Sequence, residues 1–144
     1  LADASAATVR FRSDVERKRL FGLAADADSG GAIYSVDASA RTHARLAELA
    51  RAALADGWTV IVDAAFLKRA ERRTFAALAD ELGIPFDILA CAAPVDALRE
   101  RLAARRDDAS EATAAGLEQQ QTWLGPLDGA EGARAVAPAP VRPD

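Results

Sequence analysis

The sequence has very little cysteine and no long apolar run. Its single cysteine, Cys91, excludes a disulfide within the chain. No apolar run approaches the roughly 20 residues that a membrane-spanning helix needs. The first residues also lack the basic start and long apolar core of a secretory signal. We therefore expect a cytoplasmic protein that does not enter a membrane.

Excess positive charge and the histidine and cysteine side chains of a zinc site are also lacking. The 144 residues include 18 Lys and Arg against 22 Asp and Glu, which gives a net charge of −4. Such a balance gives no bulk attraction to nucleic acid or anionic lipid, so neither is expected as a partner. The only histidine, His43, has no second histidine or nearby cysteine with which to form a zinc site or a catalytic triad. The length suits one domain.

Apolar runs alternate with amphipathic stretches along the chain. Runs rich in β-branched and aromatic residues predict strands at Thr8–Arg12, Trp58–Val62, Phe86–Ala92 and Ala133–Ala137. Apolar residues at helical spacing, together with capping residues, predict helices from Asp14 (with Ser13 and Glu16 as a capping box), over Arg41–Asp56 and Arg69–Leu82, from Pro94, and from Ser110 to about Trp123. Residues 24–40 are expected to form a loop. This alternation predicts an α/β fold with a parallel sheet covered by helices.

Asp63 directly follows the most apolar of these strands. Trp58–Val62 has almost no polar alternation, which predicts a strand buried on both faces. Ligands of open α/β sheets bind outside the carboxyl ends of the strands, so Asp63 is a candidate for holding Mg²⁺. A carboxylate is also an ordinary way for a chain to leave a strand, and both interpretations stand.

Asp14 and an arginine cluster are the other candidates for chemistry. Asp14 follows the first strand, either as a general base or as an acidic residue that favours a helix start. Arg101 and Arg105 share a helical face, and Arg106 adds a third guanidinium. These arginines suit a phosphate clamp, or else they form a solvated basic helix end. Tyr34, in the expected loop, is a weaker candidate for contacting a substrate.

Three stretches together resemble a known family. VRFRSDVERKRLFG, GWTVIVDAAFLKRAERRTF and ILACAAPVDALRERLAARRDDASEA resemble the P-loop kinase-like ATP-binding domain that is fused to aminoglycoside phosphotransferase-like domains. That domain is similar to polynucleotide 5′-hydroxyl kinases and zeta-type kinases. The resemblance covers about residues 1–128 and leaves 129–144 as a tail rich in Pro, Ala and Gly. It implies a three-layer P-loop NTPase-type parallel sheet flanked by helices.

The resemblance also implies an activity and roles for individual residues. The family transfers the γ-phosphoryl group of ATP, with Mg²⁺, to a hydroxyl of a small molecule or nucleic acid. Asp14 matches its general base and Arg17 a basic residue that positions substrate or phosphate. Asp63 matches the carboxylate that holds Mg²⁺ through water. The lid arginines that cover the ATP phosphates are matched by Arg101, Arg105 and Arg106.

One defining motif of that family is missing. The phosphate loop, GxxxxGK followed by Ser or Thr, does not occur, since neither Lys18 nor Lys68 follows a glycine. We therefore expect an N-terminally truncated piece, inactive by itself, whose sheet lacks the central first strand of the order 2-3-1-4-5. A fused phosphotransferase-like domain is expected upstream. The alternative is a non-catalytic, degenerate nucleotide-binding or interaction module of a larger protein.

Overall fold

The computed structural model describes residues 7–91, 93–104, 109–111, 113, 116, 120 and 125–136. The chain forms two compact units. The first comprises Leu1–Phe66 with Arg106–Ala112, and the second comprises Leu67–Arg105 with Thr113–Asp144. The two units reflect how the chain packs and do not test the domain boundary expected after residue 128. That boundary stays a prediction.

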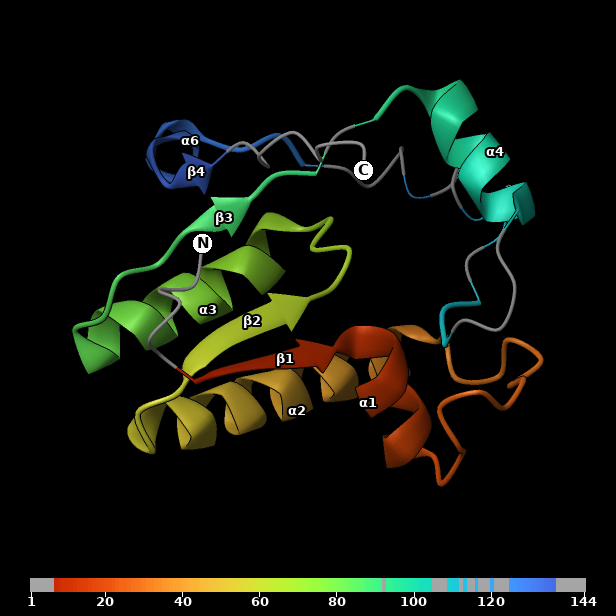
Figure 1. Ribbon diagram of the computed structural model, residues 1–144, viewed down its shortest axis with the longest axis horizontal. Coiled ribbons are helices and arrows are strands. Elements are labelled where there is room, and N and C mark those ends of the chain that lie inside the picture. Colours follow the sequence, from red (N-terminus) through yellow and green to blue (C-terminus); the bar gives the residue numbers. More distant parts are fainter. Residues whose placement is uncertain are drawn as a thin grey trace. The chain divides into compact units, whose positions relative to one another are not determined.

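A pair of parallel strands forms the sheet of the first unit. Strand β1 (Thr8–Arg12) lies beside β2 (Thr59–Asp63), in a register that runs from Thr8 opposite Thr59 to Arg12 opposite Asp63. Figure 1 shows the two arrows side by side and pointing the same way. Parallel neighbours need a long crossover connection, which the helices between them provide. The carboxyl ends of both strands therefore meet at one edge.

Strand β2 differs from its prediction in position and in burial. It begins at Thr59 and includes Asp63, whereas Trp58 lies outside it and is 44% exposed. Ile61, in the middle of the strand, is 46% exposed. Burial on both faces was therefore the wrong expectation. Side chains of these types favour the extended backbone, but burial needs neighbours, and among the described residues β2 pairs with β1 alone.

Helix α1 (Ser13–Leu20) continues directly from β1. Its N-cap is Arg12, with extended backbone and no capping side chain, so the capping box expected at Ser13 does not form. Ser13 is already helical and buried because no turn separates the strand from the helix. At the other end Gly22 (φ 70°) closes the helix as predicted, with Leu23 N–H donating to Lys18 O at 2.9 Å. The carboxyl end of β1 thus leads straight into the first turn of α1.

Helix α2 (Val36–Ala55) covers one face of this small sheet (Figure 1). It begins at Val36 rather than at Arg41, because Ser35 caps it by accepting a hydrogen bond from Ala38 N–H at 3.1 Å. Residues 36–40 are therefore helical, not loop. Every fourth residue is buried along one stripe, which consists of Ala38, Thr42, Leu46 and Ala50. This stripe forms the core of the first unit.

Helix α3 (Arg69–Leu82) is the longest described helix of the second unit. Its buried residues are Arg72, Phe75, Leu78 and Ala79, which include three of the four apolar positions predicted for its inner face. The fourth position, Leu82, is 36% exposed. The helix ends, as predicted, at Gly83 in the left-handed conformation (φ 65°).

The rest of the second unit has short elements. Strand β3 (Ile88–Leu89) pairs in parallel with β4 (Ala135–Val136), which follows helix α6 (Gly129–Ala133). The strand expected at Phe86–Ala92 therefore contracts to two residues, whereas β4 falls inside its predicted range. Over the described part of the chain, β3 and β4 pair at two ladder positions, Ile88 with Ala135 and Leu89 with Val136.

Helix α4 (Val95–Ala104) contains no buried residue, so the expected buried side with Val95, Leu98 and Leu102 does not form. The helix predicted from Ser110 to Trp123 lies mostly outside the described residues. Helices with short parallel strands make this an α/β fold, and the described strands form two two-stranded sheets. Among the described helices, none combines the length and the apolar character that crossing a bilayer requires.

Candidate functional site

Asp63 lies at the carboxyl edge of the β1–β2 sheet, opposite Arg12. Its Oδ2 atom accepts hydrogen bonds from Arg10, through Nη2 and through Nε at 3.1 Å, and lies 3.8 Å from Arg12 Nε. The Arg10 and Asp63 side chains are 58% and 40% exposed, and ion pairs this open contribute about 0–1 kcal/mol at most. The cluster therefore places a partly neutralised carboxylate where ligands of α/β sheets bind.

Asp14 and Arg17 lie three residues apart on α1, so they share one side of the helix. Arg17 is buried, with 7% of its surface exposed. Its Nη1 atom donates to Ile33 O at 3.3 Å and to Ser39 Oγ at 3.2 Å. Its Nε atom is buried and has no acceptor among the described residues. A buried guanidinium with an unpaired N–H group destabilises the folded protein unless a further acceptor binds that group.

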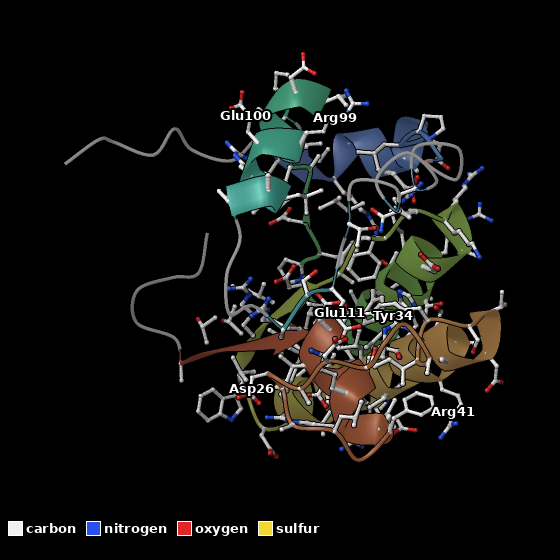
Figure 2. The ribbon with its side chains drawn as sticks, turned by 90° about the vertical axis from the view of Figure 1, so that its right-hand side faces the viewer. Asp26, Tyr34, Arg41, Arg99, Glu100 and Glu111 are labelled. Atoms are coloured by element: carbon white, nitrogen blue, oxygen red, sulfur yellow. The ribbon has the colours of Figure 1, made fainter. Side chains whose placement is uncertain are left out.

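Tyr34 completes this side of the first unit. The Arg17 guanidinium carbon lies 4.9 Å from the centroid of the Tyr34 ring, a cation–π arrangement. Burial raises the pKa of the Tyr34 phenol, and the negative charges of Asp14 and Glu111 raise it further. The phenol therefore keeps its proton at neutral pH. Figure 2 labels Tyr34, from the segment before α2, and Glu111.

Glu111 is held from three directions. Its Oε1 atom accepts from Ser29 N–H at 2.9 Å and lies 3.2 Å from Lys18 Nζ, and its Oε2 accepts from Ser29 Oγ at 2.5 Å. Burial raises the pKa of the Glu111 carboxyl, but the hydrogen bonds from Ser29 and the contact with Lys18 outweigh burial, so the net shift is downward. Lys18 is 1% exposed and also donates to Ala25 O at 3.1 Å. We call this set, Lys18, Ser29 and Glu111, the Glu111 clamp.

The basic residues near Asp14 in the sequence have other partners in the structure. Arg10 and Arg12 face Asp63, Lys18 faces Glu111, and Arg19 Nη1 lies 2.6 Å from Glu16 Oε1. Within the described part of the chain, no ion pair joins any of them to Asp14. Asp14 therefore keeps its carboxylate available for a ligand.

The turn after Asp63 carries backbone strain. Phe66 has φ 45°, in the left-handed region that non-glycine residues rarely adopt. Its ring centroid lies 5.8 Å from that of His43, whose Nδ1 is 2.9 Å from Ser39 O. Strained residues of this kind persist where packing holds them, and they concentrate near functional sites. The turn thus contacts His43, which lies one helical turn after Ser39, the residue whose Oγ accepts from Arg17.

The three predicted arginines, Arg101, Arg105 and Arg106, are not among the described residues of the first unit. Arg101 lies in the last turn of α4, in the second unit, and is exposed. Arg105 and Arg106 lie outside the described residues. Asp14, Arg17 and Asp63 all belong to the first unit, at or just beyond the carboxyl ends of its strands.

A metal site made by the protein alone is not present in the described part of the chain. No group of three His, Cys, Asp or Glu side chains comes together there. Magnesium at nucleotide sites takes one or two carboxylates, with phosphate oxygens and water as its other ligands. Asp63 fits that requirement as one carboxylate, although Arg10 competes for it. Because Asp63 supplies only one carboxylate, it would hold Mg²⁺ only together with the phosphate oxygens of a nucleotide.

The Glu111 clamp was not predicted from the sequence. Glu111 and Ser29 are 82 residues apart, and neither belongs to a periodic pattern. The only local signal is the polar, glycine-containing sequence around Ser29, which predicts a loop. Tyr34 had been named as a candidate substrate contact because of its place in that loop.

Comparison with protein families gives one match. Residues 1–127 match AAA_33, described as an AAA domain, a P-loop NTPase-like family that includes kinases. Such families bind nucleotides, usually with Mg²⁺. Neither the curated proteins nor the solved structures provide a match.

Proposed function

The chain belongs to the AAA_33 family of AAA domains, and on that premise we propose that it is a kinase-like domain that transfers the γ-phosphoryl group of ATP to a hydroxyl acceptor. The acceptor is a small molecule or a nucleic acid, and the net charge of −4 favours the small molecule. The observation that carries this proposal is the direct passage from β1 into α1. It brings Asp14 and Arg17 to the sheet edge where Asp63 ends β2.

Each of these residues has a role that its surroundings support. Asp14, which has no ion-pair partner among the described residues, accepts the proton of the acceptor hydroxyl. That hydroxyl oxygen bonds to the γ-phosphorus as the bond to the bridging oxygen breaks and ADP leaves. Arg17 directs its spare Nε donor to an anionic group of acceptor or phosphate.

The remaining residues would contact the nucleotide. When bound, ATP with Mg²⁺ supplies the phosphoryl group and neutralises part of its charge. Asp63 would hold Mg²⁺ through water, and Arg101, with Arg105 and Arg106, would bind phosphate oxygens. The 144 residues contain no GxxxxGK followed by Ser or Thr, so tight ATP binding needs such a loop in addition to them.

The test compares nucleotide binding by the 144-residue chain and by a chain extended N-terminally through a phosphate loop. We expect binding to rise steeply on extension, and we expect Asp14→Asn in the extended protein to lower phosphotransfer about 100-fold or more. Asp26→Asn, which removes the same charge from an exposed loop, is the matched control. Full activity of the Asp14→Asn protein would exclude the general base. No gain on extension would leave the non-catalytic module as the better account.

A further inference from the structure

The Glu111 clamp binds one carboxylate with three donors that belong to two residues. Ser29 supplies two of the donors, because its N–H group lies 2.9 Å from Glu111 Oε1 and its Oγ lies 2.5 Å from Oε2. Lys18 Nζ, the third donor, lies 3.2 Å from Oε1. We call these three donors the Lys18–Ser29 cradle.

Contacts that do not involve Glu111 also hold the donors of the cradle. Lys18 Nζ donates to Ala25 O at 3.1 Å. Ser29 Oγ accepts from the Gly31 N–H group at 3.2 Å, and its single hydrogen is directed to the carboxylate. Gly31 makes this contact from a left-handed backbone (φ 80°), which glycine adopts without strain. The donors would therefore keep their positions if the carboxylate were removed.

The cradle places a buried positive charge behind a partly exposed negative one. The Lys18 side chain is 1% exposed, whereas that of Glu111 is 19% exposed. A buried ammonium group that loses its counter-ion strongly destabilises a fold. The fold therefore requires an anion at this position, but the chemistry of the donors does not require that the anion belong to the chain.

The anion comes from a distant segment, whereas the cradle is local. Glu111 is 82 residues from Ser29 in the sequence. Lys18 belongs to α1, and Ser29 belongs to the loop that follows this helix. Withdrawal of Glu111 would thus expose a complete set of oxyanion donors.

We propose that the Lys18–Ser29 cradle is a binding site for the carboxylate or phosphate group of a ligand, and that Glu111 is an internal counter-ion which the ligand displaces. Both groups offer at least two oxygens to the three donors, as the Glu111 carboxylate does. Asp14 lies four residues before Lys18 on α1, so the bound anion lies along the helix that carries the proposed base. The site does not depend on phosphotransfer and is tested by anion binding alone.

The experiment removes the internal carboxylate and supplies an anion from solution. The protein is the 144-residue chain with Glu111→Ala, and the probes are sodium acetate and inorganic phosphate. The thermal unfolding midpoint is compared with that in sodium chloride at equal ionic strength. In chloride we expect the variant to unfold below the wild type, and we expect acetate or phosphate to raise its midpoint by about 5 °C. The more effective probe identifies the ligand group as carboxylate or phosphate.

Two further variants serve as controls. Glu48→Ala removes the same side chain from an exposed pair with Arg45 and should respond to the probes as the wild type does. Lys18→Gln combined with Glu111→Ala removes both charges and should abolish the response. The wild type should need about 10-fold more probe or more, because the tethered carboxylate competes at an effective concentration in the millimolar range.

Acylation of the lysines gives a second measurement. In Glu111→Ala, a bound probe should slow the labelling of Lys18 and leave that of the exposed Lys68 unchanged. Equal responses of Glu111→Ala and the wild type to the probes would overturn the proposal. An undiminished response in the double variant would also overturn it.

The proposal remains testable if Glu111→Ala does not fold in chloride. Acetate or phosphate should then restore its far-ultraviolet circular dichroism. Glu111→Gln keeps the volume of the side chain and an acceptor for Ser29, so we expect a folded chain whose unfolding midpoint the probes still raise. Failure of both probes with both variants would show that the clamp is an ion pair of the fold and not a ligand site.

Discussion

Arg72 and Glu131 form a two-point ion pair in the second unit. The Arg72 Nε atom lies 2.8 Å from Glu131 Oε1, and its Nη2 atom lies 3.0 Å from Oε2. The same guanidinium donates to the carbonyl oxygens of Leu67 and Pro126. A planar fork that donates to four acceptors joins the start of α3 to the segment around α6.

This pair predicts a dependence of stability on pH. The hydrogen bond from Arg72 lowers the pKa of Glu131 below its ordinary value of 4.5. A carboxyl with a depressed folded pKa stabilises the protein above its unfolded pKa and loses that contribution as the pH falls through the folded pKa. We expect Glu131→Gln to lower the midpoint of urea unfolding at pH 7 and to flatten its decline in acid. Glu48→Gln, which alters an exposed pair with Arg45, should change neither. An unchanged acid profile in Glu131→Gln would contradict the assignment.

Leu46 should be the most sensitive apolar position of the first unit. It is 0% exposed at the centre of the buried stripe of α2. Removing a fully buried leucine side chain costs about 2–5 kcal/mol, so Leu46→Ala should lower the free energy of unfolding by that amount. Val36→Ala, on the same helix but 81% exposed, should stay within about 0.5 kcal/mol. Similar small losses for both would show that the stripe does not form the core.

Substitution of Asp63 should affect nucleotide binding more than the free energy of unfolding. Its ion pairs are half exposed, so Asp63→Asn should change the free energy of unfolding by less than about 1 kcal/mol. If Asp63 holds Mg²⁺, the same variant of the extended protein should lose most of its magnesium-dependent nucleotide binding, measured by calorimetry with and without the metal. Arg10→Gln is the control, since it removes the partner and keeps the carboxylate. Unaltered magnesium dependence in Asp63→Asn would remove Asp63 from the metal site.

The elements that follow from local chemistry were predicted well. Gly22 and Gly83 end their helices because the left-handed conformation is inexpensive only for glycine, and the sequence shows this directly. The parallel pairing of β1 and β2 was also expected. Two local signals failed, since the capping box at Ser13 does not form and α2 begins at Val36 rather than at Arg41. The other failures depend on neighbours: Ile61 is exposed and β3 has two residues, because burial and strand length are set by partners elsewhere in the chain.

The candidate site shows the same division. Asp14 and Asp63 were identified because each follows a strand, which is a local feature of the sequence. The burial of Arg17 and the Glu111 clamp were not, because they depend on contacts between distant segments. Two predicted arginines, Arg105 and Arg106, lie outside the described residues. Their roles stay predictions.

Two substitutions at Phe66 separate the energetic cost of its left-handed backbone from the loss of its ring contact with His43. A left-handed conformation costs a non-glycine residue about 1–2 kcal/mol, whereas glycine adds about 0.5–1 kcal/mol of unfolded-state entropy. Both Phe66→Ala and Phe66→Gly lose the ring contact with His43, but only glycine relieves the strain. We expect Phe66→Gly to be more stable than Phe66→Ala by up to about 1 kcal/mol in thermal unfolding. An alanine variant more stable than the glycine variant would contradict the left-handed backbone.

The burial of Lys18 has a consequence for chemical modification of the chain. Lys18 and Lys68 are the only lysines, and each unit contains one of them. Lys68 is exposed, whereas Lys18 is 1% exposed and paired with Glu111. Amine acylation should therefore mark Lys68 at once and reach Lys18 only when the first unit opens. Labelling of Lys18 thus reports the opening of the first unit, and labelling of Lys68 serves as the internal control for the reagent.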